Sequence, residues 1–514
     1  MPTLNWIGKE AVVNHDKEVP FRLLKKVKSA SVGNSQNLVI HGDNLEALKA
    51  LMPFYIGKVK CIYIDPPYNT GNEGWVYNDK VNSPKIKKWL GKVVGRDSED
   101  LCRHDKWLCM MYPRVKLLKD LLSDDGAIFV SIDDVEQSNL RALLDCIFGE
   151  DNFVTNVIWE KNYSPRNDAK YFSASHDFIL VYAKSKAKWT RNLLLRTEKQ
   201  NKYYKFDDNN GRGLWRPDNV LVKTFSESGV FGIKNPNTGE VSYPPKGSCY
   251  RFSEERAKQL LKENKFYFGK DGKGKPQLKR YLSEVKQGVV PQTIWRYEEV
   301  GHNQTGKNEL NKLVDMNVFD SPKPVSLIKH ILQIATDKND LVLDSFAGSG
   351  TTGHAVLDLN KEDSGDRKFI LVEMEDKVAK DVTAERVKRA IKQYDYKDGF
   401  EYCELSKPLF DEEGQIEDTC DFNQFATYIY FTETQTNIDP AKVSANYIGE
   451  YAETEYYLIY KEKGENVLSK SFLKKLRKTD STKVIYADKC MLDEATLEKH
   501  NIVFKQIPYE VKVY

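Results

Sequence analysis

The fold is decided by one stretch of this chain, Leu341-Val342-Leu343-Asp344-Ser345-Phe346-Ala347-Gly348-Ser349-Gly350-Thr351-Thr352-Gly353. Residues 341–344 read as a short buried strand, the glycines after them as a turn, and residues 354–359 as helix. A strand, a glycine turn and a helix let the backbone approach a nucleotide-like ligand closely. The stretch therefore predicts the nucleotide-binding part of an α/β sheet.

A second strand strengthens this prediction and leaves two cofactor classes open. Residues 368–372 read as a strand that ends in Glu373, at the place where an acidic residue usually binds ribose hydroxyls. Gly348, Gly350 and Gly353 also spell G-x-G-x-x-G, so a nicotinamide- or flavin-dependent oxidoreductase is one candidate. Such fingerprints usually open a domain, whereas this one follows several strands. S-adenosylmethionine needs the same carboxylate but has no pyrophosphate, and it is the second candidate.

The tetrapeptide Asp65-Pro66-Pro67-Tyr68 follows the apolar run 61–64. Two prolines donate no backbone hydrogen bond and fix φ near −65°, so the strand must stop there. A carboxylate, outward carbonyl groups and a tyrosine ring then lie together at the end of a strand. This combination suits a planar group that carries an exocyclic amine, although a simple Asp-Pro-Pro turn with a surface tyrosine is the alternative.

Alternating strand and helix patterns predict a Rossmann-like, mostly parallel α/β sheet with helices on both faces. The expected strands are 37–41, 60–64, 126–132, 177–183, 341–344 and 368–372, and the expected helices are 45–52, 112–122, 137–147, 324–336 and 376–393. Ligands bind such sheets outside the carboxyl ends of the strands, so Asp65, Asp344 and Glu373 should face one crevice.

Charge is distributed unevenly along the 514 residues. The formal net charge is only +3, but residues 184–296 hold 25 Lys and Arg against 11 Asp and Glu. Aromatic residues are interleaved with these cations, which is the composition of a segment that reads nucleic acid. Residues 401–514 carry 14 basic and 21 acidic residues and indicate a protein-contact domain, with strand-like segments at 425–432 and 455–461.

Composition narrows the class of protein further. The sequence contains neither a long apolar segment nor a signal-peptide pattern, so we expect a soluble cytoplasmic protein without membrane contact. Its eight cysteines are scattered, and Cys102, His104 and Cys109 lack the spacing of a zinc site, so no metal site is expected.

The two motifs together resemble the amino-group DNA methyltransferases, in the permuted motif order of the β class. Further segments resemble the modification subunit of type III restriction–modification systems. They are 37–48, 68–71, 77–79, 107–114, 5–9 and 501–509. The resemblance implies a class I methyltransferase that transfers a methyl group from S-adenosyl-L-methionine to N6 of a flipped-out adenine in double-stranded DNA.

The resemblance also implies roles for particular residues. Asp65, Pro66, Pro67 and Tyr68 would be catalytic, and the cofactor would contact Asp43, Lys323, Asp344, Phe346, Gly348, Gly350 and Glu373. For Asp43 a helix N-cap is an equal alternative. Ser131 and Asp133 would line the base pocket.

The implied organisation has five parts. They are an N-terminal arm (1–36), a catalytic half (37–184), an inserted α+β target-recognition domain (185–299), a cofactor half (300–400) and a small C-terminal interaction domain (401–514). A homodimer and a restriction subunit with helicase and endonuclease activity are the expected partners. A solitary adenine methyltransferase and a cytosine-N4 methyltransferase remain alternatives.

Overall fold

The computed structural model of the chain forms two compact units, which we treat separately. The core unit comprises residues 1–192 and 292–514, and the insert unit comprises residues 193–291. The structure describes residues 4–70, 88, 91–92, 102–196, 198–285, 288–315, 318–410, 415–417, 419–461 and 466–507. Residues 77–79 and 508–509, which carry part of the resemblance, lie outside this description.

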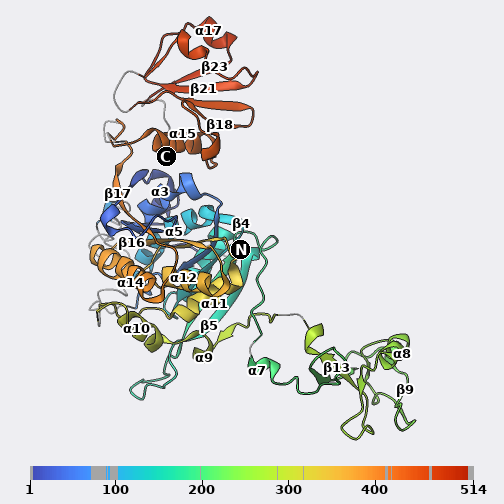
Figure 1. Cartoon of the computed structure of the whole chain (residues 1–514). Helices are drawn as coiled ribbons and strands as arrows, with labels where there is room; N and C mark the ends of the chain where they lie inside the picture. The colour runs from blue at the N-terminus through green and yellow to red at the C-terminus, as the bar shows by residue number, and fades with distance from the viewer. Residues whose placement is uncertain are drawn as a thin grey trace. The chain divides into compact units, whose positions relative to one another are not determined.

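A ten-stranded sheet organises the core unit (Figure 1). Its strands, in spatial order, are β1 (Arg22–Lys26), β17 (Glu401–Pro408), β2 (Leu38–His41), β16 (Lys368–Glu373), β15 (Leu341–Asp344), β3 (Val59–Ile64), β4 (Leu122–Ile132), β6 (His176–Ala183), β5 (Phe153–Glu160) and β14 (Ile294–Trp295). Six of the nine pairings are parallel, and β1–β17, β4–β6 and β5–β6 are antiparallel. The predicted mostly parallel sheet is thus confirmed, and all six predicted strands are present.

Two strands join this sheet from segments that we expected outside the methyltransferase core. Residues 22–26 of the expected N-terminal arm form the edge strand β1, and β17 starts at residue 401, where the C-terminal domain was expected to begin. The sheet therefore includes one strand from each of the two segments that flank the expected methyltransferase core.

Helices cover both faces of the sheet. One face carries α3 (Asn44–Tyr55), α5 (Arg103–Leu121) and α6 (Gln137–Phe148). The other carries α11 (Val325–Ala335), α12 (Thr351–Asp363) and α14 (Glu385–Tyr394), with α13 (Asp376–Val378) and a π-helical turn at 379–384 before α14. Side chains alternate between the faces along β16: Ile370 packs on the α5 side, whereas Phe369 and Leu371 contact Gly353 of α12.

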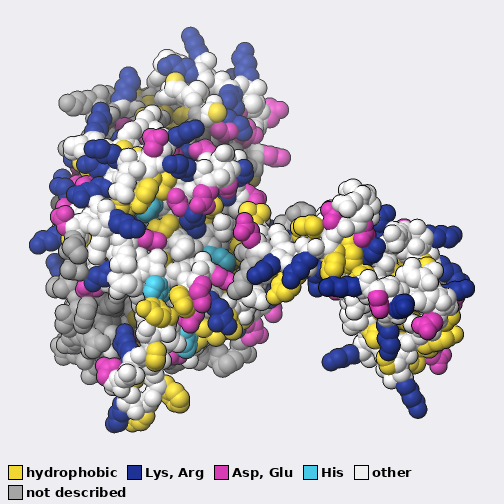
Figure 2. Space-filling model, turned by 60° about the horizontal axis from the view of Figure 1, so that its bottom comes forward, with side chains coloured by type: hydrophobic (Ala, Val, Ile, Leu, Met, Phe, Trp, Pro, Cys, Tyr) yellow, Lys and Arg dark blue, Asp and Glu magenta, His cyan; other side chains and the backbone are white. Residues whose placement is uncertain are grey.

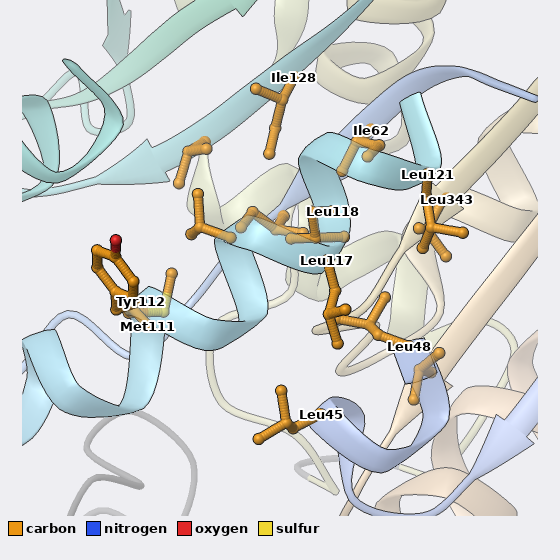
Figure 3. Close-up of a cluster of buried hydrophobic side chains, with 14 of the residues drawn as sticks. Leu45, Leu48, Ile62, Met111, Tyr112, Leu117, Leu118, Leu121, Ile128 and Leu343 are labelled. Atoms are coloured by element: carbon orange, nitrogen blue, oxygen red, sulfur yellow. The ribbon is translucent and has the colours of Figure 1, made fainter. Parts of the chain in front are cut away.

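The core on the α5 side is a single buried cluster. Leu117, Leu118 and Leu121 of α5 meet side chains from α3 and from strands β3, β4 and β15 (Figure 3). Each fully buried aliphatic side chain of this kind contributes about 1.5–3 kcal/mol relative to exposure. This packing fixes the sheet edge on which the site residues lie.

The insert unit is built from short strands around a small aromatic core. Its elements are α7 (Glu198–Asn201), β7 (Trp215–Asp218), β8 (Leu221–Val222), β9 (Ile233–Lys234), β10 (Val241–Ser242), β11 (Cys249–Tyr250), α8 (Glu254–Lys262), β12 (Phe266–Tyr267) and β13 (Gln277–Tyr281). Figure 2 shows Lys and Arg side chains projecting from its surface. We expected an α+β insert between residues 185 and 299, and the unit spans 193–291.

The C-terminal part of the core unit has its own four-stranded sheet, formed by β18 (Tyr447–Tyr451), β19 (Thr454–Leu458), β21 (Thr482–Ala487) and β23 (Ile502–Gln506). The expectation of a strand at 425–432 is wrong, because these residues lie in helix α15 (Phe422–Thr434). Asp421 and Gln424 form a capping box at its start, and Phe425, Tyr428 and Ile429 pack into a cluster that includes Phe21. Capping and packing outweigh the strand preference of these aromatic and β-branched residues.

The remaining elements of the description are short. They are α1 (Lys9–Val12), α2 (His15–Glu18), α9 (Tyr297–Val300), α10 (Asn303–Asn311), β20 (Val467–Leu468), α16 (Lys470–Leu473), β22 (Lys489–Cys490), α17 (Glu494–Lys499) and 3-10 turns at 28–30, 150–152, 227–229, 282–284 and 440–442. Within the described ranges, none of the helices combines the length and apolarity needed to span a bilayer.

Candidate active site

A cavity of about 400 Å³ lies in the core unit and is lined by the carboxyl ends of β3, β15 and β16. Nine of the eleven predicted site residues line it: Asp65, Pro66, Pro67, Tyr68, Lys323, Asp344, Phe346, Gly348 and Glu373. Its volume falls in the usual range for small-ligand pockets. The crevice expected at these strand ends therefore exists.

The Asp65 carboxylate has one engaged and one open oxygen. Oδ2 accepts a hydrogen bond from the Lys323 ammonium group, which lies 258 residues away in the chain. Oδ1 is buried and has no hydrogen-bond partner among the described residues. A buried carboxylate oxygen without a donor is costly, so this atom is poised to accept a hydrogen bond from a ligand.

The rest of the tetrapeptide is held in place by a hydrogen bond from a tryptophan and by a cation–π contact. Trp107 of α5 donates its indole N–H to the Pro67 carbonyl at 2.7 Å. The Tyr68 ring is partly buried, and the Lys323 Nζ lies 5.2 Å from its centroid. Burial, followed by the charges of Asp65 and Asp177, raises the pKa of Tyr68 well above its usual range, so its hydroxyl stays protonated.

Three charged residues of the cavity wall, Lys161, Arg166 and Asp177, escaped the sequence analysis. Asp177, at the start of β6, accepts a hydrogen bond from Tyr68 at 3.5 Å and from the Lys161 ammonium at 2.5 Å. Burial raises the pKa of Asp177 above its usual value. The sequence signal for Asp177 was only its position before an apolar strand. Lys161 had no signal, because strand β5, which brings Lys161 here, was not predicted.

The Asp344 carboxylate stabilises the turn that follows β15. One oxygen accepts the Phe346 backbone N–H at 3.0 Å, and the other accepts the Thr352 hydroxyl at 2.6 Å. The side chain is almost completely buried, and burial raises its pKa to about 7. Asp344 lines the cavity, but these bonds already engage both of its oxygens.

The glycine turn is fixed to the neighbouring strand by Glu373. The Glu373 carboxylate accepts the Gly348 N–H at 2.9 Å and the Glu375 N–H at 3.0 Å. Gly348 has φ +49°, and a Cβ there would lie 3.0 Å from the Phe319 ring. Gly350 has φ +74°, and a Cβ there would lie 2.9 Å from the Thr383 carbonyl oxygen. Both positions therefore favour glycine.

Asp43 and Gly350 are the two predicted site residues that do not line the cavity. Asp43 is the N-cap of α3, where its carboxylate accepts the N–H groups of Leu45 and Glu46 and also pairs with the buried Arg114 guanidinium at 3.4 Å. The adjacent Asn44 lines the cavity instead. The geometry thus supports the helix-cap alternative for Asp43, and Gly350 acts at the start of α12.

Of the two residues expected at the base pocket, only Asp133 lines the cavity. Its pKa is raised to about 6, mainly by burial. Ser131 is fully buried and hydrogen-bonds the Tyr63 hydroxyl at 2.9 Å.

Behind the tetrapeptide, a buried carboxylate fixes the chain that follows Tyr68. Glu136 is fully buried and accepts hydrogen bonds from Asn69 and from His104, the latter at 2.7 Å. Asn69 has φ +58°, a left-handed conformation that its amide contacts hold in place. Across the described part of the chain, three or more His, Cys, Asp or Glu side chains are nowhere grouped so that they could hold a metal ion.

A mostly parallel sheet, with a glycine turn and acidic residues at the strand ends that face one crevice, is the architecture of α/β proteins that bind nucleotides. A family model described as DNA methylase matches residues 59–385. The chain therefore belongs to the DNA methylase family, which confirms the resemblance read from the sequence.

Relatives of known class agree with this assignment. The chain is 40% identical to the Mod subunit of the StyLTI type III restriction–modification enzyme of Salmonella typhimurium, over 69% of this chain and 54% of that protein. It is 33% identical to the EcoPI Mod subunit of Escherichia phage P1, over 74% of this chain and 64% of the relative. The chain thus spans about half to two thirds of the length of these relatives.

Among solved structures, a putative DNA modification methylase of Thermus thermophilus in complex with S-adenosyl-L-methionine covers 71% of this chain and 99% of its own. The identity is 14% and the TM-score is 0.33, a level at which the likeness supports no conclusion.

Proposed function

We propose that this chain transfers a methyl group from S-adenosyl-L-methionine to N6 of adenine at a specific sequence in double-stranded DNA. The observation that carries the proposal is the buried Oδ1 of Asp65, which has no partner within the described part of the chain and lies in the same cavity as the glycine turn and Glu373. Membership of the DNA methylase family supports it. The nicotinamide-dependent alternative leaves this acceptor without a role.

The cavity residues fit the proposed methyl donor. Glu373 lies at the end of β16, where a carboxylate suits ribose hydroxyls. The Ser345 hydroxyl is buried in the cavity wall without a hydrogen-bond partner among the described residues. Phe346 and Gly348 complete this side. When bound, S-adenosyl-L-methionine supplies an electrophilic methyl group on its sulfonium.

The catalytic side of the cavity suits an aromatic amine. The lone pair of adenine N6 is delocalised into the ring, which makes the nitrogen a poor nucleophile. Asp65 Oδ1 and the Pro66 carbonyl would accept its two hydrogens and turn the lone pair out of conjugation. Orientation by these two acceptors, together with proximity, would then supply most of the rate enhancement.

The target amine is inaccessible inside a duplex, so the base must leave the stack. Tyr68 is the stacking partner that we assign to the extruded base. Its hydroxyl is held by Asp177 and its ring faces the Lys323 ammonium, so the ring is oriented before the base arrives. Pro67 fixes the backbone between acceptor and ring.

Cytosine-N4 methylation is the second candidate, because the same acceptors suit the cytosine amine. The identity of the methylated base therefore has to be measured and is part of the first experiment.

The partners follow from the parts of the chain that lie away from the cavity. We assign sequence recognition to the basic insert. We also infer that the protein acts in the cytoplasm, where its DNA substrate is found. We infer that this chain binds a second copy of itself. We also infer that it binds a restriction subunit, because it is similar to Mod subunits of type III restriction–modification enzymes. A solitary methyltransferase is the alternative, and light scattering of the chain alone and with a co-expressed restriction subunit distinguishes the two.

The test is transfer of labelled methyl groups from S-adenosyl-L-methionine to unmethylated duplex DNA, followed by nucleoside analysis. We expect N6-methyladenine, and methylation-sensitive sequencing of the same DNA gives the recognition sequence. Label in N4-methylcytosine would replace adenine by cytosine as the target. Absence of label in DNA, with NAD and not S-adenosylhomocysteine bound by the protein, would overturn the proposal.

A further inference from the structure

The chain between β5 and β6 carries large aromatic side chains into solvent. Residues 161–175, which we call the aromatic arm, form a hairpin that Figure 1 shows projecting beyond the ends of these strands. Phe172 is 95% exposed, Tyr171 82% and Tyr163 62%. Exposing two adjacent aromatic rings at a hairpin tip leaves apolar area in water, which points to an interaction site.

The arm is an ordered hairpin. At its base, the Lys161 and Asn162 N–H groups donate to the Ser175 carbonyl at 2.9 and 3.1 Å. Further out, the Arg166 N–H donates to the Ser173 hydroxyl at 2.8 Å. These bonds join the two limbs of the hairpin below its tip, from which the exposed rings project.

The base of the arm is part of the cavity wall. Lys161 and Arg166 both line the cavity that contains Asp65 and Tyr68. Lys161 also pairs with Asp177, which holds the Tyr68 hydroxyl. The exposed tip therefore begins five residues after Arg166, which is part of the cavity wall.

The charge of the arm selects the kind of partner. It contains Lys161, Arg166 and Lys170 against one acidic residue, Asp168. The Lys170 Nζ lies 5.2 Å from the Tyr171 ring centroid, so a cation accompanies the exposed ring. Cations next to flat apolar groups suit phosphates next to bases, whereas a purely apolar tip would suit a protein groove.

We propose that the aromatic arm enters duplex DNA beside the target base, and that Tyr171 and Phe172 occupy the space left in the stack. This inference rests on the proposed function. Extruding a base costs a few kcal/mol of lost stacking and pairing, and an apolar side chain inserted between base steps recovers part of it. The arm thus acts on base extrusion, whereas Asp65 and Tyr68 act on the extruded base.

The experiment compares the wild-type chain with the Tyr171→Ala/Phe172→Ala double variant on two duplexes that carry the recognition sequence. In one duplex the target base is normally paired. In the other it lies opposite an abasic site, so extrusion costs little. We expect the variant to lose about ten-fold or more in methyl transfer on the paired duplex, because each 1.4 kcal/mol of lost stabilisation is ten-fold. On the abasic duplex it should recover to within about two-fold of wild type.

Two control variants make the result specific. Tyr171→Phe/Phe172→Tyr keeps both rings and should behave as wild type on both duplexes. Tyr451→Ala removes an exposed aromatic side chain on β18, 46% exposed and far along the chain, and should also leave transfer unchanged.

Each other outcome is decisive. Equal loss on both duplexes, or no loss on either, would overturn the arm's role in extrusion while leaving the methyltransferase assignment intact. Unchanged transfer together with lost binding of a protein subunit would make the arm a protein-contact element and also overturn the proposal. Failure of the wild-type chain on both duplexes would instead count against the proposed function.

Discussion

Two neighbouring strands of the core sheet, β3 and β15, pair in parallel and each leads into an aspartate at the same crevice. Asp65, directly after β3, has a buried carboxylate oxygen that no residue in the described ranges contacts by a hydrogen bond. Asp344, at the end of β15, engages both oxygens with Phe346 and Thr352. The same residue type at the same sheet edge thus has two different environments. An open oxygen is available for a substrate, and a closed one stabilises the turn.

The comparison separates chemistry from stability within one cavity. Asp65 is paired with Lys323 across 258 residues, and its side chain is one quarter exposed. Asp344 is almost fully buried, and burial raises its pKa to about 7. Substituting the first should therefore affect methyl transfer most, and substituting the second should affect folding most.

The largest expected effect is on activity. Asp65→Asn keeps the side-chain volume and one oxygen for Lys323 but removes the carboxylate, so methyl transfer should fall by roughly 10²–10⁴-fold. The thermal midpoint should change little. Single-turnover transfer of labelled methyl groups and a melting curve measure the two effects, and transfer at the wild-type rate would contradict the catalytic assignment.

The next effect is on the pH dependence of stability. Folded Asp344 keeps its proton up to about pH 7, whereas in the unfolded chain it loses the proton near pH 4. The native state therefore binds more protons between these values, and this group's contribution to the free energy of unfolding falls as the pH rises from 4 to 7.

Asp344→Asn removes this titration. Urea denaturation at pH 4.5 and pH 8 should show the stability difference between wild type and variant shrinking as the pH rises, by roughly 3 kcal/mol. The titration of all other groups is the same in both proteins, so it cancels when the free energy of unfolding of the variant is subtracted from that of the wild type. A pH-independent difference would show that Asp344 has an ordinary pKa in the folded protein.

The smallest effect concerns a third aspartate, Asp43, which follows β2. As the N-cap of α3 it accepts two backbone N–H groups, so Asp43→Ala should cost about 1 kcal/mol of stability through the lost cap, in addition to the loss of its pair with Arg114. The affinity for S-adenosylhomocysteine should change by less than about two-fold, since Asp43 does not line the cavity. A large loss of affinity in calorimetry would return Asp43 to the cofactor site, and Asp43→Ser is the control that keeps a cap.

Local chemistry is what the sequence determined. The φ restriction of Pro66 and Pro67, the glycines at positions 348 and 350 and the apolar periods of the strands follow from each residue and its close neighbours. These features were enough to predict the sheet and the crevice, whereas Lys323 and Phe346 of its lining were predicted only from the resemblance to the amino-group DNA methyltransferases. Residues 425–432 show the limit of local preference, because a cap and a packed face made them helical.

Only the tertiary structure decided which of these residues act together. Lys323 reaches Asp65 because α11, which begins two residues after Lys323, packs against β3. Lys161 reaches Asp177 because β5 and β6 pair antiparallel. Asp344 takes both of its donors from the turn and helix that follow it, whereas the donor to Asp65 is Lys323, which lies 258 residues away. Such contacts depend on strand order and packing over hundreds of residues, and local propensity carries no information about them.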